Sequence, residues 1–94
     1  MTDRYFLLIN LVKEWQANNY QDFTRVESFF REEILPDQDP NRLRFHVEMH
    51  RLIKLIQADL ALLKASRSEE NRQKYLTKLQ EKAASLIALC QSCG

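Results

Sequence analysis

Residues 39–70 read DPNRLRFHVEMHRLIKLIQADLALLKASRSEE, and this stretch decides the fold. Asp39 is a favourable N-cap, and Pro40 suits the first helical position because a helix start leaves that amide unpaired in any case. Apolar side chains then recur at helical spacing as far as about Ala65. A second N-cap, Ser68, is followed by two glutamates, which favour a helix N-terminus. The short turn between the two helices predicts a long antiparallel hairpin.

Both helices of the predicted hairpin carry an apolar stripe. The stripe of the first helix consists of Phe45, Met49, Leu52, Ile53, Ile56, Leu60 and Leu63, and a weaker patch of Leu43, Val47, Ala58 and Ala61 lies on its opposite side. The stripe of the second helix consists of Tyr75, Leu76, Leu79, Ala83, Leu86, Ile87 and Cys90. A single stripe is what a helix needs to face one core, so we expect the two main stripes to share a core.

The first part of the chain predicts two more helical segments. One runs from about Asp3 to Asn18 and the next from about Tyr20 to Leu35, where the following proline ends it. An asparagine pair interrupts the pattern between them, and the sequence leaves open whether they are separate helices or one kinked helix. With the hairpin, they predict an all-α fold, a small antiparallel bundle of about four helices that forms a single domain over residues 1–94.

The composition narrows the functional classes. Glycine occurs once and proline twice in 94 residues, which favours long helices with few turns. Fourteen basic and thirteen acidic residues alternate along the chain with a net charge of +1, which disfavours nucleic acid and anionic membranes as partners. The N-terminal apolar run is too short for a membrane span and lacks the features of a signal peptide. Two cysteines are too few for a disulfide framework, so we expect a cytoplasmic protein with reduced thiols.

The segment at residues 3–18 is apolar around most of its circumference, over an arc of roughly 260°. A central helix of a small bundle can bury such an arc internally. We expect instead that part of it forms a homodimer or partner surface, because monomers rarely leave large apolar patches uncovered. Aromatic side chains dominate interface energetics. The arc consists of Tyr5, Phe6, Leu7, Leu8, Ile9, Leu11, Val12 and Trp15, and the expected anchors among them are Tyr5, Phe6, Leu8 and Trp15.

A metal site is the sharpest alternative. Cys90 and Cys93 form a C-x2-C pair, and His46 and His50 lie one helical turn apart, which are both spacings that zinc sites use. Folding of the hairpin places His46 close to Cys90 but His50 more than a turn from either cysteine. Because a tetrahedral site needs four converging ligands, a buried structural role for Cys90 is the favoured interpretation. We expect no metal or cofactor, and keep a metal-binding or nucleic-acid-handling helical module as the alternative function.

Catalytic motifs are not recognisable in the sequence. Arg44 and His50 have the Arg-x5-His spacing of helical ribonucleases of the HEPN type, but Phe45 replaces the polar residue that follows the arginine in that family. A Gly-rich phosphate loop is excluded because the only glycine is terminal. We therefore expect a protein that is not an enzyme and that acts by binding other proteins.

Four stretches of the chain resemble a known family. They read FFREEILP at residues 29–36, EMHRLIKLIQADL at 48–60, LKASR at 63–67 and LIALCQ at 86–91. In this order they are similar to the cyanobacterial heterocyst-frequency-control protein PatD and its relatives. The likeness covers roughly residues 23–92, whereas the first segment matches only in being an apolar helix.

The resemblance implies a regulator without catalytic residues. It implies a role in how often vegetative cells become heterocysts, and the tubulin-like cell-division protein FtsZ as a partner. Relatives also occur in cyanobacteria that form no heterocysts. A division-linked role is thus the more general expectation from this resemblance.

Overall fold

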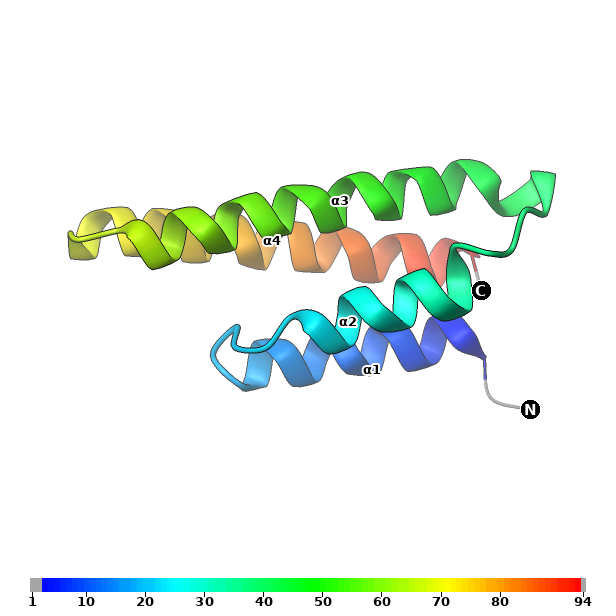
Figure 1. Cartoon of the computed structure of the whole chain (residues 1–94), viewed down its shortest axis with the longest axis horizontal. Coiled ribbons are helices and arrows are strands. Elements are labelled where there is room, and N and C mark those ends of the chain that lie inside the picture. Colours follow the sequence, from blue (N-terminus) through cyan, green and yellow to red (C-terminus); the bar gives the residue numbers. More distant parts are fainter. Residues whose placement is uncertain (1–2, 94) are drawn as a thin grey trace.

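The computed structural model describes residues 3–93 of the chain, and in this range it contains helices joined by turns and no strand (Figure 1). Its elements are α1 (Arg4–Ala17), α2 (Thr24–Phe29), the π-helical turn η1 (Phe30–Ile34), α3 (Pro40–Ala65) and α4 (Glu69–Cys93). The expected all-α fold is confirmed. None of the helices within residues 3–93 combines the length and the apolar character that crossing a lipid bilayer requires.

The hairpin of α3 and α4 has the bounds that its capping residues predict. The Asp39 side chain accepts a hydrogen bond from the backbone amide of Asn41 (3.0 Å), and α3 begins at Pro40. At the start of α4, the backbone amide of Asn71 donates to the Ser68 hydroxyl (3.2 Å). Each side-chain oxygen satisfies an amide that the helix itself leaves unpaired.

The turn after α1 answers the question that the sequence left open. Backbone φ is positive at Asn19 (56°), Tyr20 (60°) and Asp22 (58°), which reverses the chain and makes α1 and α2 separate helices. The left-handed conformation is costly for a tyrosine. The Tyr20 ring packs edge-on against Trp15 with a centroid separation of 4.9 Å, and this contact helps to hold the turn. The predicted start of the second helix at Tyr20 was therefore wrong by four residues, since α2 begins at Thr24.

The helix that begins as α2 ends as a π-helical turn. The backbone amide of Leu35 donates to the carbonyl of Phe30 (2.8 Å), five residues earlier, and Pro36 follows. This wider turn rotates the end of the helix while both Phe30 and Ile34 stay buried. A proline disfavours helical geometry at the residue before it, so the helix ends where the sequence predicted.

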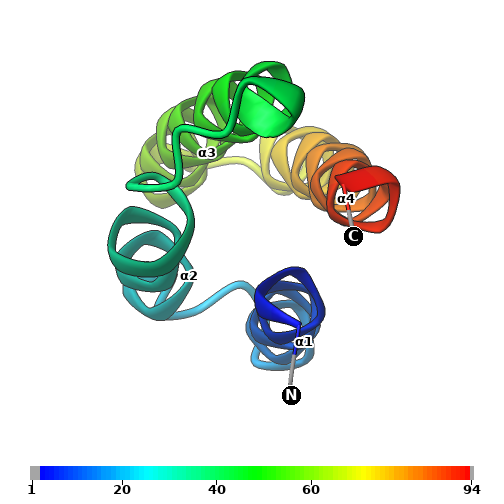
Figure 2. The same ribbon diagram turned by 90° about the vertical axis from the view of Figure 1, so that its right-hand side faces the viewer.

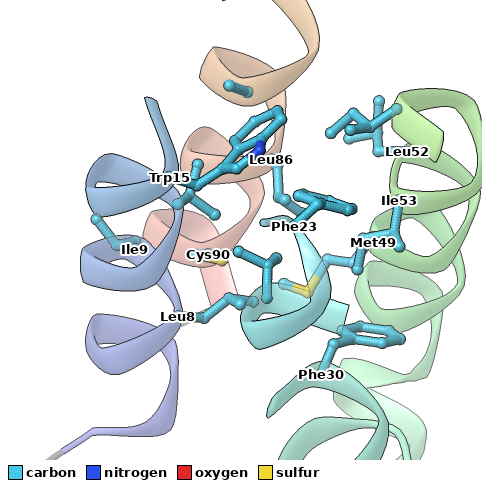
Figure 3. Packing of buried hydrophobic residues seen from close by; sticks show 14 of the residues in the cluster. Leu8, Ile9, Trp15, Phe23, Phe30, Met49, Leu52, Ile53, Leu86 and Cys90 are labelled. Atoms are coloured by element: carbon cyan, nitrogen blue, oxygen red, sulfur yellow. The ribbon is translucent and has the colours of Figure 1, made fainter. Parts of the chain in front are cut away.

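Seen along its length, the bundle places α1, α4, α3 and α2 in that order around a common centre (Figure 2). Both hairpin stripes and the inner face of α1 meet there (Figure 3). The fully buried centre includes Leu8, Val12, Ile34, Met49, Ile56, Leu79 and Leu86. Midway along the hairpin, Lys82 of α4 forms an ion pair with the buried carboxylate of Asp59 of α3.

A second group of polar contacts closes the end of the bundle opposite the hairpin turn. Arg4 of α1 contacts the carboxylate of Asp37 (2.5 Å) and donates to the carbonyl of Glu33 (2.9 Å). Arg42 of α3 contacts the same carboxylate (3.3 Å). Through these contacts Asp37, in the loop before α3, ties the beginnings of α1 and α3 together. The pKa of the Asp37 carboxyl falls to about 2, chiefly because Arg4 hydrogen-bonds its charged form.

Candidate functional site

An apolar groove runs along the outer face of α1 and α2. It has a volume of about 540 Å³ and is lined by Leu7, Asn10, Leu11, Glu14, Arg25, Ser28, Phe29 and Glu32. Next to it on α1, Phe6 is 56% exposed, and Leu7 is 38% exposed. Leu11 and Phe29 are half-buried in its floor. This combination of aromatic and aliphatic side chains within a shallow groove is typical of a surface that receives another protein.

The inner face of α1 determines which of its side chains reach this groove. Leu8 and Val12 are fully buried, and Trp15 packs on Phe23 with a centroid separation of 4.6 Å. Because successive side chains on a helix are 100° apart, burial of Leu8 turns its neighbour Leu7 towards the edge of α2. Phe6 then points away from the core altogether, consistent with its large exposure.

The four expected anchors divide into three core residues and one surface residue. Tyr5, Leu8 and Trp15 are 3%, 0% and 3% exposed, so they cannot serve as contact points for a partner on the folded chain. The expectation underestimated internal burial, because α1 packs against α2, η1 and α4 at once and these neighbours cover most of its apolar arc. Only Phe6 lies on the surface, as expected.

Other members of the groove were not singled out from sequence. Leu7 and Leu11 belonged to the apolar arc, but their place at its edge depends on where α2 packs. Phe29 flanks the buried face of α2. Its position in the sequence, next to the buried Phe30, is the signal that could have placed it at the edge of that face. The residues that remain accessible lie along the boundary between α1 and α2. The apolar periodicity of one helix does not show where this boundary lies, because it depends on how the other helix packs.

The rim of the groove carries more negative than positive charge. Glu14 and Arg25 form an ion pair across it (3.5 Å), and both side chains are mostly exposed, so this pair contributes little to stability. Glu32 lines the same groove without an ion-pair partner among residues 3–93. With one arginine already engaged by one glutamate, the remaining charge on the rim is acidic. A segment with apolar side chains flanked by basic ones is complementary to it.

A second apolar groove lies on the outer face of the hairpin. It has a volume of about 730 Å³, and Leu43, Phe45 and Val47 of α3 and Leu89 of α4 are among its lining residues. Val47 is 59% exposed, and Leu43 is also exposed, as expected for the weaker patch of α3. The ring of Phe45 lies under the Arg44 guanidinium at 5.4 Å.

The two histidines are engaged with different neighbours. Nε2 of His46 lies 2.6 Å from the Tyr5 hydroxyl, and its Nδ1 lies 3.2 Å from the Asp37 carbonyl. A carbonyl only accepts, so Nδ1 carries the proton, and Tyr5 donates to Nε2. The ring of His50 instead lies against Phe30, with centroids 5.8 Å apart. Burial is the main cause that raises the pKa of the Tyr5 phenol, with the Cys93 thiol adding to it.

The residues of the alternative metal site are not assembled. Within residues 3–93, His, Cys, Asp and Glu side chains form no group of three or more that could hold a metal ion. Cys90 is buried, and burial raises the pKa of its thiol to about 12. Cys93 is half-exposed. His46 and His50 are separated by their contacts with Tyr5 and Phe30, so the four residues of the alternative site do not converge on one point.

The Arg-x5-His pair does not form a site either. Arg44 lies over Phe45, and His50 packs on Phe30 of the neighbouring helix. The geometry therefore gives these two residues no common contact.

No protein family, no curated protein and no solved structure matches this chain.

Proposed function

We propose that the chain is a non-enzymatic regulator that acts by binding another protein in the groove between α1 and α2. The observation that carries this proposal is the groove lined by Leu7, Leu11 and Phe29, with the exposed Phe6 next to it on α1; all four side chains stay at least partly accessible after the core is complete. Aromatic and aliphatic side chains at the centre of a contact, with polar residues around them, supply most of the free energy of protein association.

The rim charge supports one class of occupant. An amphipathic helix or extended segment that presents apolar side chains to the groove and a basic one to Glu32 is complementary in charge. The resemblance to the PatD family suggests cytoplasmic FtsZ as the partner, in a division-linked role in a cyanobacterium. A nucleic-acid-handling role has less support, because basic and acidic residues alternate along the chain.

Matched substitutions on the two grooves test this proposal. Phe6 and Val47 have nearly equal exposures, 56% and 59%. Phe6 adjoins the groove of α1 and α2, and Val47 lines the groove on the hairpin. Binding of purified cyanobacterial FtsZ would be measured by calorimetry for the unaltered chain, for Phe6→Asp and for Val47→Asp. We expect Phe6→Asp to weaken binding at least about tenfold, as loss of an aromatic anchor does, and Val47→Asp to change it less than about twofold.

Two outcomes would contradict the proposal. If Val47→Asp weakens binding and Phe6→Asp does not, the groove on α3 receives the partner instead. If the unaltered chain does not bind FtsZ at about 100 µM, the partner suggested by the resemblance is wrong. Helical content and melting temperature of each variant show whether a loss of binding arises from a loss of folding.

A further inference from the structure

The α3–α4 hairpin is longer than the helices that cover it. α3 has 26 residues and α1 has 14, which correspond to about 39 Å and about 21 Å of helix. The hairpin is therefore about 18 Å longer than α1, and this difference is divided between its two ends (Figure 1). The larger overhang in Figure 1 lies at the end where α3 turns into α4. Beneath it, one layer of the bundle is missing.

A cavity of about 880 Å³ lies in the step where the overhang begins. Its apolar lining comes from Tyr20 of the α1–α2 turn and from Leu60, Leu63 and Leu76 of the hairpin, all of them half-buried. These leucines continue the core stripes of α3 and α4 beyond the point where α1 and α2 stop. The overhang thus has the inner surface of a four-helix bundle without the helices that would complete it.

Charges of opposite sign border the step. Lys64 and Arg72 lie on the hairpin side, and Asp22 and Glu27 lie on the side of the α1–α2 turn. None of these four side chains forms an ion pair within residues 3–93. The surface therefore has an apolar middle, a basic end towards the hairpin turn and an acidic end towards α2.

We propose that a second copy of the chain fills this step, with the hairpin overhang of each copy lying under the overhang of the other. The missing layer is one helix pair thick, and the overhang that would fill it is also one helix pair thick, about 10 Å. A two-fold axis through the middle of the overhang brings the basic end of one copy against the acidic end of its partner, twice. Such a contact is self-complementary and closed.

The size of the step sets the strength of this dimer. The length difference of about 18 Å is an upper limit on the length of this surface, and with a width of about 20 Å it gives at most roughly 360 Å² per copy, or about 700 Å² in total. This lies below the roughly 1,200 Å² of standard specific interfaces, so we expect weak self-association, with a dissociation constant on the order of 100 µM. The contact leaves the groove beside Phe6 free, and it does not rest on the proposed function.

Charge reversals at the two ends test the contact and its symmetry. Glu27→Lys removes the net negative charge of the acidic end, and Arg72→Glu removes the net positive charge of the basic end. Asp22 is left unchanged because its carboxylate accepts a hydrogen bond from Thr24 within the turn. Sedimentation velocity from roughly 10 to roughly 500 µM would measure self-association of each variant alone and of the two mixed in equal amounts.

We expect each reversal alone to weaken self-association at least about tenfold, and the mixture to restore it as a heterodimer. Lys54→Glu, an exposed reversal on α3 outside the step, should leave it unchanged. A chain that is monomeric at the highest concentration would overturn the proposal. The proposal would also be overturned if neither charge reversal changed the dissociation constant of the dimer, or if the two variants failed to associate when mixed.

Two further measurements keep these results interpretable. Lys64→Glu replaces Arg72→Glu if circular dichroism shows that the latter has lost helical content. FtsZ binding by Glu27→Lys separates this proposal from the proposed function, because that variant should lose self-association and keep its partner. Phe6→Asp should show the opposite behaviour.

Discussion

The hydroxyl of Tyr5 donates a hydrogen bond to Nε2 of His46 over 2.6 Å, and this contact joins α1 to α3 in the interior of the bundle. Both side chains are almost completely buried. Nδ1 of the same ring is occupied by the carbonyl of Asp37, so the imidazole is held at both nitrogens. A buried polar group that is fully hydrogen-bonded adds specificity to the packing of two helices, whereas an unpaired one is costly.

Removal of the Tyr5 hydroxyl should therefore destabilise the fold. In Tyr5→Phe the buried Nε2 of His46 loses its donor while the ring that packs in the core is kept. We expect the free energy of unfolding to fall by about 1–3 kcal/mol, measured by denaturant titration. Tyr75→Phe is the matched control, because the hydroxyl of Tyr75 makes no hydrogen bond with residues 3–93, and it should change stability by less than about 0.5 kcal/mol. Equal stability of Tyr5→Phe and the unaltered chain would contradict this account.

Asp37 should make the protein sensitive to acid in a defined window. Its pKa is lowered from 3.8 to about 2, mainly by the hydrogen bond from Arg4, so the folded state favours the charged carboxylate. A lowered pKa stabilises the fold above the unfolded value and is lost as the pH falls through the folded one. We expect stability to decrease between about pH 4 and about pH 2, and this part of the decrease to vanish in Asp37→Asn. A carboxyl ¹³C titration of Asp37 with a midpoint near 3.8 would contradict the prediction.

The pair of Asp59 and Lys82 provides a test of buried charge. The side chains are 9% and 23% exposed, and each one compensates the charge of the other between α3 and α4. Lys82→Met leaves the Asp59 carboxylate alone in the hairpin, and we expect a loss of about 3 kcal/mol. Replacing both residues with leucine should recover most of this loss, since two apolar side chains of similar volume need no compensation. If the double variant is less stable than Lys82→Met, the ion pair contributes more to the free energy of unfolding than the mutual compensation of two buried charges.

The hairpin could be predicted from sequence because its signals are local. Asp39, Pro40 and Ser68 act on the amides next to them, and the structure places the helix starts where these residues indicate. The turn before α2 had no comparable signal. Its three left-handed residues include Tyr20, whose side chain disfavours that conformation and is held there by Trp15, a contact that depends on the folded arrangement.

The candidate groove shows the same limit at the level of packing. Helical spacing identified the apolar arc of α1 correctly, but not which part of it stays accessible. That depends on how closely α2, η1 and α4 surround α1, which is a property of several segments together. Trp15 illustrates this point, since an aromatic side chain expected at an interface is 3% exposed in the core. Phe6 is 56% exposed because no element within residues 3–93 covers its side of α1.

The two cysteines should differ strongly in reactivity. The thiolate is the nucleophile, and burial raises the pKa of the Cys90 thiol to about 12, so only about one molecule in 10⁴ carries the thiolate at pH 8. Cys93 lies one turn further on and is half-exposed. With a chromogenic disulfide reagent at pH 8 we expect one thiol to react quickly and the second only as fast as the chain unfolds. In Cys93→Ser the fast phase should disappear, and denaturant should restore reaction of the remaining thiol. Rapid reaction of Cys90 in the folded Cys93→Ser variant would show that α4 opens at its end far more readily than the packing of Cys90 implies.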